Sequence, residues 1–316
     1  MQNKILITEF MDEASVDALR REFAVDYEPG LVGQRAALLA RVGDYPALIV
    51  RNATQVDQAL LAAAPRLKVV GRLGVGLDNI DVATCAARGI EVIPATGANA
   101  LSVAEYVITT ALVLLRGAYH AHGAMAAGQW PRPALSKGRE IAGKTLGLIG
   151  FGGIGRLTAG LAHGLSMKVI ANDPALPPDH EVWREHHVEQ DRIEGVIARA
   201  DVLSLHVPLV DATRNFIDAT RLAAMKPGAV LINTARGGVV DEAALAAALQ
   251  SGHLGGAALD VFLHEPLPEE SPLARALKHG LGNLILTPHI AGVTTESNER
   301  VSQLIAEKVA QFLRTH

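Results

Sequence analysis

Hydrophobic residues follow two alternating patterns along this chain. Short apolar runs typical of buried strands occur at residues 5–8, 47–50, 68–73 and 91–93. Between them, stretches such as 13–23 and 56–63 repeat apolar residues every three or four positions, as one face of a helix does. A second series of apolar runs occurs at residues 145–149, 168–171, 202–206, 229–233, 256–260 and 284–287. Strands that alternate with helices predict parallel sheets covered by helices on both faces.

The two series predict two doubly wound α/β domains. We expect residues 101–127 to form one long connecting helix and residues 128–143, rich in Gly, Pro and Arg, to form a loop. The last helical pattern, 294–312, follows the final strand and can return to pack on the first domain. The sequence therefore predicts a discontinuous domain of residues 1–99 and 290–316, and a second domain of residues 100–289.

Composition narrows the class of protein. A chain of 316 residues is long enough for about two domains. With 49% hydrophobic and 20% charged residues it is not a disordered protein, and a net charge of −4 gives no basic surface for nucleic acid. The only cysteine, Cys85, excludes a disulfide scaffold and suits a reducing compartment. No apolar stretch approaches the ~20 residues of a membrane span, and the apolar start is too short for a signal peptide. We expect a cytoplasmic protein.

A glycine-rich turn predicts a dinucleotide site. Residues 150–155 read G-x-G-x-x-G, directly after one apolar run and at the start of a helical pattern. Such a turn lets the backbone approach a pyrophosphate and points helix N–H groups at it. Asp173 ends the next strand, where its carboxylate would bind the adenosine ribose and repel a 2′-phosphate, which favours NAD over NADP. The residues expected to bind the cofactor here are Gly150, Gly152, Gly153, Ile154, Gly155 and Asp173.

Polar residues follow three successive strands of the second series. Arg236 comes after the strand at 229–233, Asp260 and Glu265 after the next, and His289 after the last. Open α/β sheets bind ligands at the carboxyl ends of their strands. An arginine can hold and polarise a carboxylate-bearing substrate, a histidine can move a proton, and a carboxylate can orient the histidine. Behind a dinucleotide site, this set predicts reduction of a carbonyl group or the reverse reaction.

The chain resembles the D-isomer-specific 2-hydroxyacid dehydrogenases over essentially its whole length. The resemblance implies a flavodoxin-like substrate domain, a Rossmann NAD-binding domain, and a homodimer formed through the latter. It also implies that Arg236 binds the substrate, that Glu265 partners His289, and that His289 is the general acid and base. The resemblance is carried by residues 150–155, His206, Pro208, Thr213, 233–237, Asp260, Glu265, Pro266, Pro288 and His289. The further cofactor contacts it implies are His206, Pro208, Thr213, Thr234, Ala235, Arg236, Asp260, His289 and Gly292.

The resemblance also implies a substrate loop at residues 71–81, where the backbone N–H groups of Val75 and Gly76 would bind the substrate carboxylate. Within the family, residues 50–54 and this loop are similar to phosphoglycerate dehydrogenases. Residues 7–13 and 94–100 are similar to sulfolactate dehydrogenases. The expected substrate-binding residues are Arg51, Asn52, Arg72, Gly74, Val75, Gly76, Arg236 and His289. No metal ligand is expected.

Arg51 and Arg72 predict a second anion on the substrate, a sulfonate or phosphate on C3, with Asn52 and Thr54 as neutral donors. The alternative for Arg72 is a salt bridge to Asp78 or Asp81. A glyoxylate or hydroxypyruvate reductase is the alternative activity. An NAD-sensing corepressor-like binding protein is the alternative of another class, because such proteins keep the Arg, Glu and His.

Overall fold

The computed structural model describes residues 3–316, apart from the side chain of His120. The chain forms two compact units, which are described separately. Unit one contains Met1–Asn99 and Val293–His316, and unit two contains Ala100–Gly292. Within the described residues, no helix combines the length and the apolar character that a membrane crossing requires.

Unit one contains a five-stranded parallel sheet in the order β2-β1-β3-β4-β5. This is the flavodoxin-like order of a doubly wound sheet. Val50 pairs with Arg72, so the strands β3 and β4 end side by side at one edge. The strands are β1 (Lys4–Ile7), β2 (Ala24–Tyr27), β3 (Ala47–Val50), β4 (Val69–Arg72) and β5 (Glu91–Pro94).

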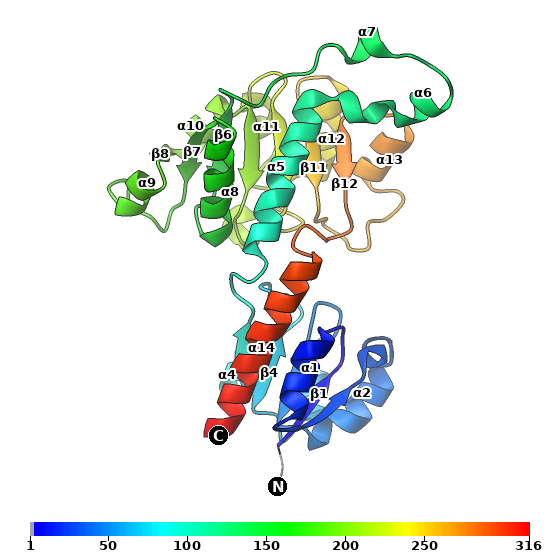
Figure 1. The fold of residues 1–316 in the computed structure, drawn as a ribbon, viewed down its shortest axis with the longest axis vertical. Helices are drawn as coiled ribbons and strands as arrows, with labels where there is room; N and C mark the ends of the chain where they lie inside the picture. Colours follow the sequence, from blue (N-terminus) through cyan, green and yellow to red (C-terminus); the bar gives the residue numbers. More distant parts are fainter. Residues whose placement is uncertain (1–2) are drawn as a thin grey trace. The chain divides into compact units, whose positions relative to one another are not determined.

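Helices cover both faces of this sheet because alternate strand residues point to opposite sides. Ile5 and Ile7 pack with α1 and α14 on one face, and Leu6 packs with α2, α3 and α4 on the other. Figure 1 shows α14 running alongside α1 and β4. The helices are α1 (Glu13–Arg20), α2 (Arg35–Arg41), α3 (Gln58–Ala63), α4 (Val82–Ala87) and α14 (Thr295–Thr315), with 3₁₀ turns η1 (Pro29–Gly33) and η2 (Val42–Asp44).

Unit two contains a seven-stranded parallel sheet in the order β12-β11-β10-β9-β6-β7-β8. Its strand order reverses between β6 and β9, as in a Rossmann fold, and open α/β sheets bind ligands beyond the carboxyl ends of the strands at such a point. The strands are β6 (Thr145–Ile149), β7 (Lys168–Asn172), β8 (Glu189–Gln190), β9 (Val202–Leu205), β10 (Val230–Asn233), β11 (Gly256–Leu259) and β12 (Leu284–Leu286).

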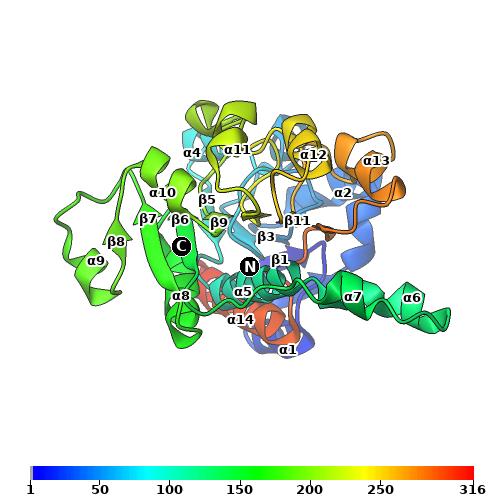
Figure 2. The same cartoon turned by 90° about the horizontal axis from the view of Figure 1, so that it is seen from above.

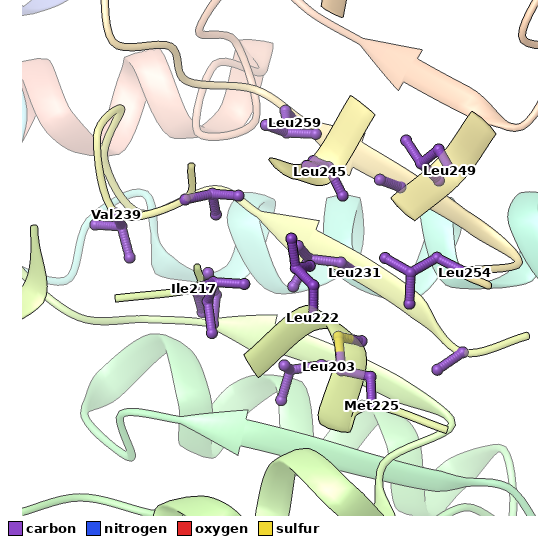
Figure 3. Close-up of a cluster of buried hydrophobic side chains, with 14 of the residues drawn as sticks. Leu203, Ile217, Leu222, Met225, Leu231, Val239, Leu245, Leu249, Leu254 and Leu259 are labelled. Carbon is purple, nitrogen blue, oxygen red and sulfur yellow. The ribbon is translucent and has the colours of Figure 1, made fainter. Parts of the chain in front are cut away.

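Two apolar clusters fix helices on the two faces of this sheet (Figure 2). On one face lie α5 (Ala100–Arg116), α8 (Gly153–Gly164) and α9 (Glu181–Glu185). On the other lie α10 (Ile193–Arg199), α11 (Ala219–Ala224), α12 (Glu242–Gln250) and α13 (Pro272–Lys278). In Figure 3, Leu222 of α11 and Leu245 of α12 meet Leu231 of β10 in the second cluster. This packing holds the strand ends that carry the candidate site.

The predicted fold class, two doubly wound parallel-sheet domains, is confirmed. The prediction of one helix over 101–127 is wrong. α5 ends at Arg116 because Gly117 has a φ of +65°, and η3 (Ala118–Ala121) and α6 (His122–Ala126) follow. The expected loop at 128–143 contains one short helix, α7 (Arg132–Leu135), before β6.

Candidate active site

Glu265 and His289 meet where β11 and β12 end. The Nδ1 atom of His289 lies 2.7 Å from Oε2 of Glu265, and the other carboxylate oxygen accepts the backbone N–H of Phe262 at 3.0 Å. Glu265 is therefore fixed at one oxygen and orients the imidazole with the other. The His289 side chain remains 44% exposed. Because Nδ1 faces Glu265, Nε2 is the ring nitrogen left for a substrate.

Asp260 holds the backbone that carries His289. Its side chain is buried, and its carboxylate accepts N–H groups from Ile290 at 2.8 Å and Ala291 at 2.7 Å. The hydroxyl of Thr287 donates to the same carboxylate at 2.6 Å. The backbone carbonyl of Asp260 also accepts the N–H of His289 at 2.9 Å. These bonds hold His289 at a φ of +56°, which a non-glycine residue seldom adopts without support.

Sequence reasoning missed Tyr106 and Thr287. The Tyr106 hydroxyl lies 2.7 Å from the Thr287 hydroxyl, which extends the Asp260 network to α5. Burial raises the pKa of Tyr106 to about 12, so the phenol keeps its proton. Two features of the sequence could have indicated these residues. One is a tyrosine in a mostly apolar helix, and the other is a threonine directly before Pro288.

Arg236 lies on a tight loop after β10. The Asn233 side chain closes this loop by accepting from the N–H of Ala235 at 3.1 Å and donating to the carbonyl of Arg236 at 3.0 Å. A Cβ on Gly237 would lie 1.7 Å from the Phe262 carbonyl oxygen, so the loop packs directly on the segment after β11. Arg236 also donates to the Ala235 carbonyl at 2.7 Å. Arg236, Glu265 and His289 thus follow three neighbouring strands at one sheet edge.

The glycines of the turn at 150–155 are needed for two different reasons. Gly150 has a φ of +96°, and a Cβ there would lie 2.3 Å from the His206 carbonyl oxygen. A Cβ on Gly155 would lie 2.6 Å from the Gly150 carbonyl oxygen, so both are required by packing within the protein. By contrast, a Cβ on Gly152 would meet no described atom within 4 Å. Gly152 therefore leaves open space at the N-terminus of α8, which suits a pyrophosphate.

Two further residues at the carboxyl ends of strands in unit two, Asp173 and Thr234, suit a dinucleotide. The Asp173 carboxylate, after β7, accepts the N–H groups of Phe151 at 2.8 Å and Ala175 at 2.9 Å, which fixes it beside the turn. The Thr234 hydroxyl oxygen is buried and has no hydrogen-bond partner among the described residues. A buried hydroxyl without a partner is costly, and a ligand can supply the missing bond.

The remaining expected cofactor contacts also lie in unit two. Burial lowers the pKa of His206 to about 4, so the ring is neutral near pH 7, and its Nε2 lies 3.0 Å from the Ser204 hydroxyl. Thr213 donates to the Pro208 carbonyl at 2.6 Å and closes the turn after β9. The others are Ile154 in the first turn of α8, Ala235 after β10, and Gly292 at the end of the unit.

The expected substrate residues of unit one gather where β3 and β4 end. Nη2 of Arg51 donates to Oδ1 of Asn298 at 2.9 Å. Nη1 of Arg72 donates to the Leu73 carbonyl at 3.3 Å and lies 1.4 Å from where a Cβ of Gly74 would be. A Cβ on Gly74 would therefore push the guanidinium of Arg72 aside. Asn52, Val75 and Gly76 follow on the same two loops, and Asn52 and Val75 are exposed.

Comparison with known proteins gives consistent results. Residues 108–291 match the family profile described as D-isomer specific 2-hydroxyacid dehydrogenase, NAD binding domain. The chain is 54% identical over 310 residues to the (S)-sulfolactate dehydrogenase of Chromohalobacter salexigens, covering 98% of both chains. It is 40% identical over 305 residues to the D-3-phosphoglycerate dehydrogenase of Mycobacterium leprae, covering 96% of this chain and 56% of that protein. The D-lactate dehydrogenase of Aquifex aeolicus, solved in complex with NAD and lactic acid, superposes with a TM-score of 0.84 at 28% identity, covering 99% of this chain and 96% of that chain.

Proposed function

Because this chain belongs to the D-isomer specific 2-hydroxyacid dehydrogenase family, and is thereby an NAD-dependent oxidoreductase of 2-hydroxy acids, we propose that it interconverts (S)-sulfolactate and 3-sulfopyruvate. The observation that carries this proposal is the position of Arg51, a second cationic group at the end of β3. The identity to a relative named for this substrate supports it. Unit two then holds the dinucleotide together with Arg236 and His289, and unit one holds Arg51.

The positions of Arg236, Glu265 and His289 support the following catalytic roles. When bound, NADH supplies a hydride to the C2 carbonyl carbon. Arg236 binds the substrate's carboxylate and carbonyl oxygen, which withdraws charge from that carbon. His289 gives its Nε2 proton to the oxygen that becomes the alcohol, while Glu265 holds Nδ1. In the oxidative direction His289 accepts the proton of the substrate alcohol at Nε2. Asp260 positions the His289 loop by accepting the backbone N–H groups of Ile290 and Ala291.

A substrate panel tests the proposal. NADH-dependent kcat/KM is measured for sulfopyruvate, phosphohydroxypyruvate, hydroxypyruvate and glyoxylate, with wild type, Arg51→Ala and Arg35→Ala. Charge-assisted hydrogen bonds contribute roughly 1.5–3 kcal/mol, so Arg51→Ala should lose about tenfold or more on the two substrates with a C3 anion and less on glyoxylate. Arg35→Ala is the matched control, because it also removes a guanidinium from unit one. Arg35 pairs with Asp57 on the surface of that unit.

The outcomes separate the candidate functions. Equal losses on all four substrates with Arg51→Ala would make Arg51 a structural residue. A wild type that prefers glyoxylate or hydroxypyruvate would be a reductase of those acids. A chain that binds NADH and turns over none of the four would be a nucleotide-sensing protein.

We also propose that the protein is a cytoplasmic homodimer that associates through unit two. The segment between α5 and β6 exposes large apolar side chains, with Trp130 73% and Tyr119 58% exposed. Such groups mark interaction surfaces when they gather on one segment. Light scattering after gel filtration should give twice the chain mass, and Trp130→Ser should shift the protein toward the monomer. A wild-type monomer at micromolar concentration would contradict the dimer.

A further inference from the structure

Glu9 is a buried carboxylate that binds the backbone of the Arg51 loop. It follows β1 and is 6% exposed. Its Oε1 accepts the N–H groups of Arg51 at 2.8 Å and Thr54 at 2.9 Å. Its Oε2 accepts those of Ala53 at 3.1 Å and Asn52 at 3.3 Å. Four consecutive backbone N–H groups therefore donate to one carboxylate. These bonds compensate the free-energy cost of burying its charge.

Two other side chains fix the same loop. The Thr8 hydroxyl lies 3.0 Å from the Thr54 hydroxyl, inside the unit. The Asn79 amide donates to the Thr54 carbonyl at 2.7 Å and to the Arg51 carbonyl at 3.3 Å. Because the N–H groups of residues 51–54 and the carbonyls of Arg51 and Thr54 are bonded, the loop holds the Cα of Arg51 in one place. Little conformational freedom is then left to lose when a ligand binds.

The guanidinium of Arg51 is held by neutral groups. Nη2 donates to the amide oxygen of Asn298 in the first turn of α14, and the Arg51 Cζ lies 5.9 Å from the centroid of the Phe10 ring. Burial lowers the pKa of Arg51, and the charge of Glu9 acts against this. An arginine guanidinium keeps its charge in proteins, so Arg51 is a cation. A neutral amide orients this cation without forming the ion pair that a carboxylate would form with it.

We propose that Glu9 and Asn298 are positioning residues that hold Arg51 ready for a second anion, and thereby set the preference for 2-oxo acids with a C3 sulfonate or phosphate. This inference rests on the proposed function. Glu9 fixes the backbone of residues 51–54, and Asn298 fixes the direction of the guanidinium. The amide of Asn298 is the specificity-determining feature, because a carboxylate in its place would compete with the substrate's own anion for Arg51.

The test replaces the amide by a carboxylate. Asn298→Asp is nearly isosteric, and an aspartate in the first turn of a helix is favourable, so we expect α14 to form. Gln303→Glu makes the same change on the same helix, where Gln303 bonds to the exposed Glu307. This control adds one negative charge to α14 at an exposed position and replaces the bond to Glu307 by a like-charge pair. The readout is kcat and KM for sulfopyruvate and glyoxylate with NADH.

We expect Asn298→Asp to reduce the ratio of kcat/KM for sulfopyruvate to kcat/KM for glyoxylate by about tenfold or more, mainly through KM. Gln303→Glu should change this ratio less than about twofold. Glu9→Gln should move the ratio in the same direction, because its amide N–H₂ group faces two backbone donors. An unchanged ratio in Asn298→Asp, or an equal change in Gln303→Glu, would overturn the inference. If the wild type itself shows no preference for sulfopyruvate, the proposed function fails instead.

Discussion

The residues proposed to be catalytic follow strand ends, so their order in the sequence predicts where they gather. The structure places Arg236, Glu265 and His289 after three adjacent parallel strands. The residues that hold them could not be predicted in this way. Asp260 supports the His289 loop, and Asn298 reaches Arg51 across 247 positions of sequence. Such contacts depend on the turn geometry of each loop and on the packing of α14, which hydrophobic periodicity does not encode.

Removing the imidazole of His289 should stop proton transfer and leave cofactor binding intact. General acid–base catalysis typically contributes ~10²–10⁴-fold, so His289→Ala should lose about that much in kcat. NADH titration by fluorescence should give an affinity close to that of wild type. His264→Ala serves as the control, because His264 is an exposed histidine one residue before Glu265. Near-normal turnover in His289→Ala would contradict the assignment.

His206 should make unit two less stable in acid. Its pKa is lowered from 6.5 to about 4 by burial, so between these values the unfolded chain binds a proton that the folded chain does not. The stabilisation is complete above pH 6.5 and is lost as the pH falls toward 4. At about 1.4 kcal/mol per pKa unit, the loss is about 3 kcal/mol.

The measurement is the unfolding free energy of the cofactor-free protein between pH 7.5 and pH 4.5, in the transition that reports unit two. His206→Gln should show a decline that is smaller by about 2–3 kcal/mol than that of wild type. Parallel curves for the two proteins would show that His206 titrates equally in both states.

Among the elements, strands with unbroken apolar runs were predictable, including the edge strands β5 and β12, whereas the edge strands β2 and β8 were not. The run at 47–50 is β3, and that at 145–149 is β6. The sequence did not indicate β2, where Asp26 interrupts the apolar pattern of an edge strand, or β8, which has two residues. Edge strands bury less surface, so fewer of their positions need to be apolar. The break after α5 depends on one backbone conformation at Gly117, which composition alone does not reveal.

The β6–α8 turn gives a matched pair of glycine substitutions. Gly155→Ala would force a Cβ to 2.6 Å from a carbonyl oxygen, and such overpacking typically costs about 1–3 kcal/mol of stability. Gly152→Ala meets open space at a φ of −76°, so stability should stay within about 0.5 kcal/mol. NADH affinity should nevertheless fall about tenfold or more in Gly152→Ala, because the new methyl group occupies the space for the pyrophosphate.

Unfolding curves and NADH titrations of both variants check this pair. If Gly152→Ala bound NADH as tightly as wild type, the open space at the start of α8 would not be the pyrophosphate site.

At the scale of the whole molecule, the chain leaves unit one at Asn99 and returns to it at Val293. The return places Val301, Ile305 and Val309 of α14 in the core of unit one. Gly71 of β4 permits this, because a Cβ there would lie 2.7 Å from Ile305 and 2.8 Å from Val309. The same helix begins with the turn that carries Asn298, so the segment that completes the core also reaches the Arg51 loop.

The proposed enzyme is a D-specific 2-hydroxyacid dehydrogenase whose substrate carries a sulfonate on C3. Sulfur on C3 outranks the carboxyl group in the naming rules, so the arrangement called R in D-lactate is called S in sulfolactate. The most direct test is the initial rate of NAD reduction with each pure enantiomer of sulfolactate. We expect (S)-sulfolactate to be oxidised and (R)-sulfolactate to give no rate above background. Oxidation of the R enantiomer, or of neither while (R)-3-phosphoglycerate is oxidised, would contradict it.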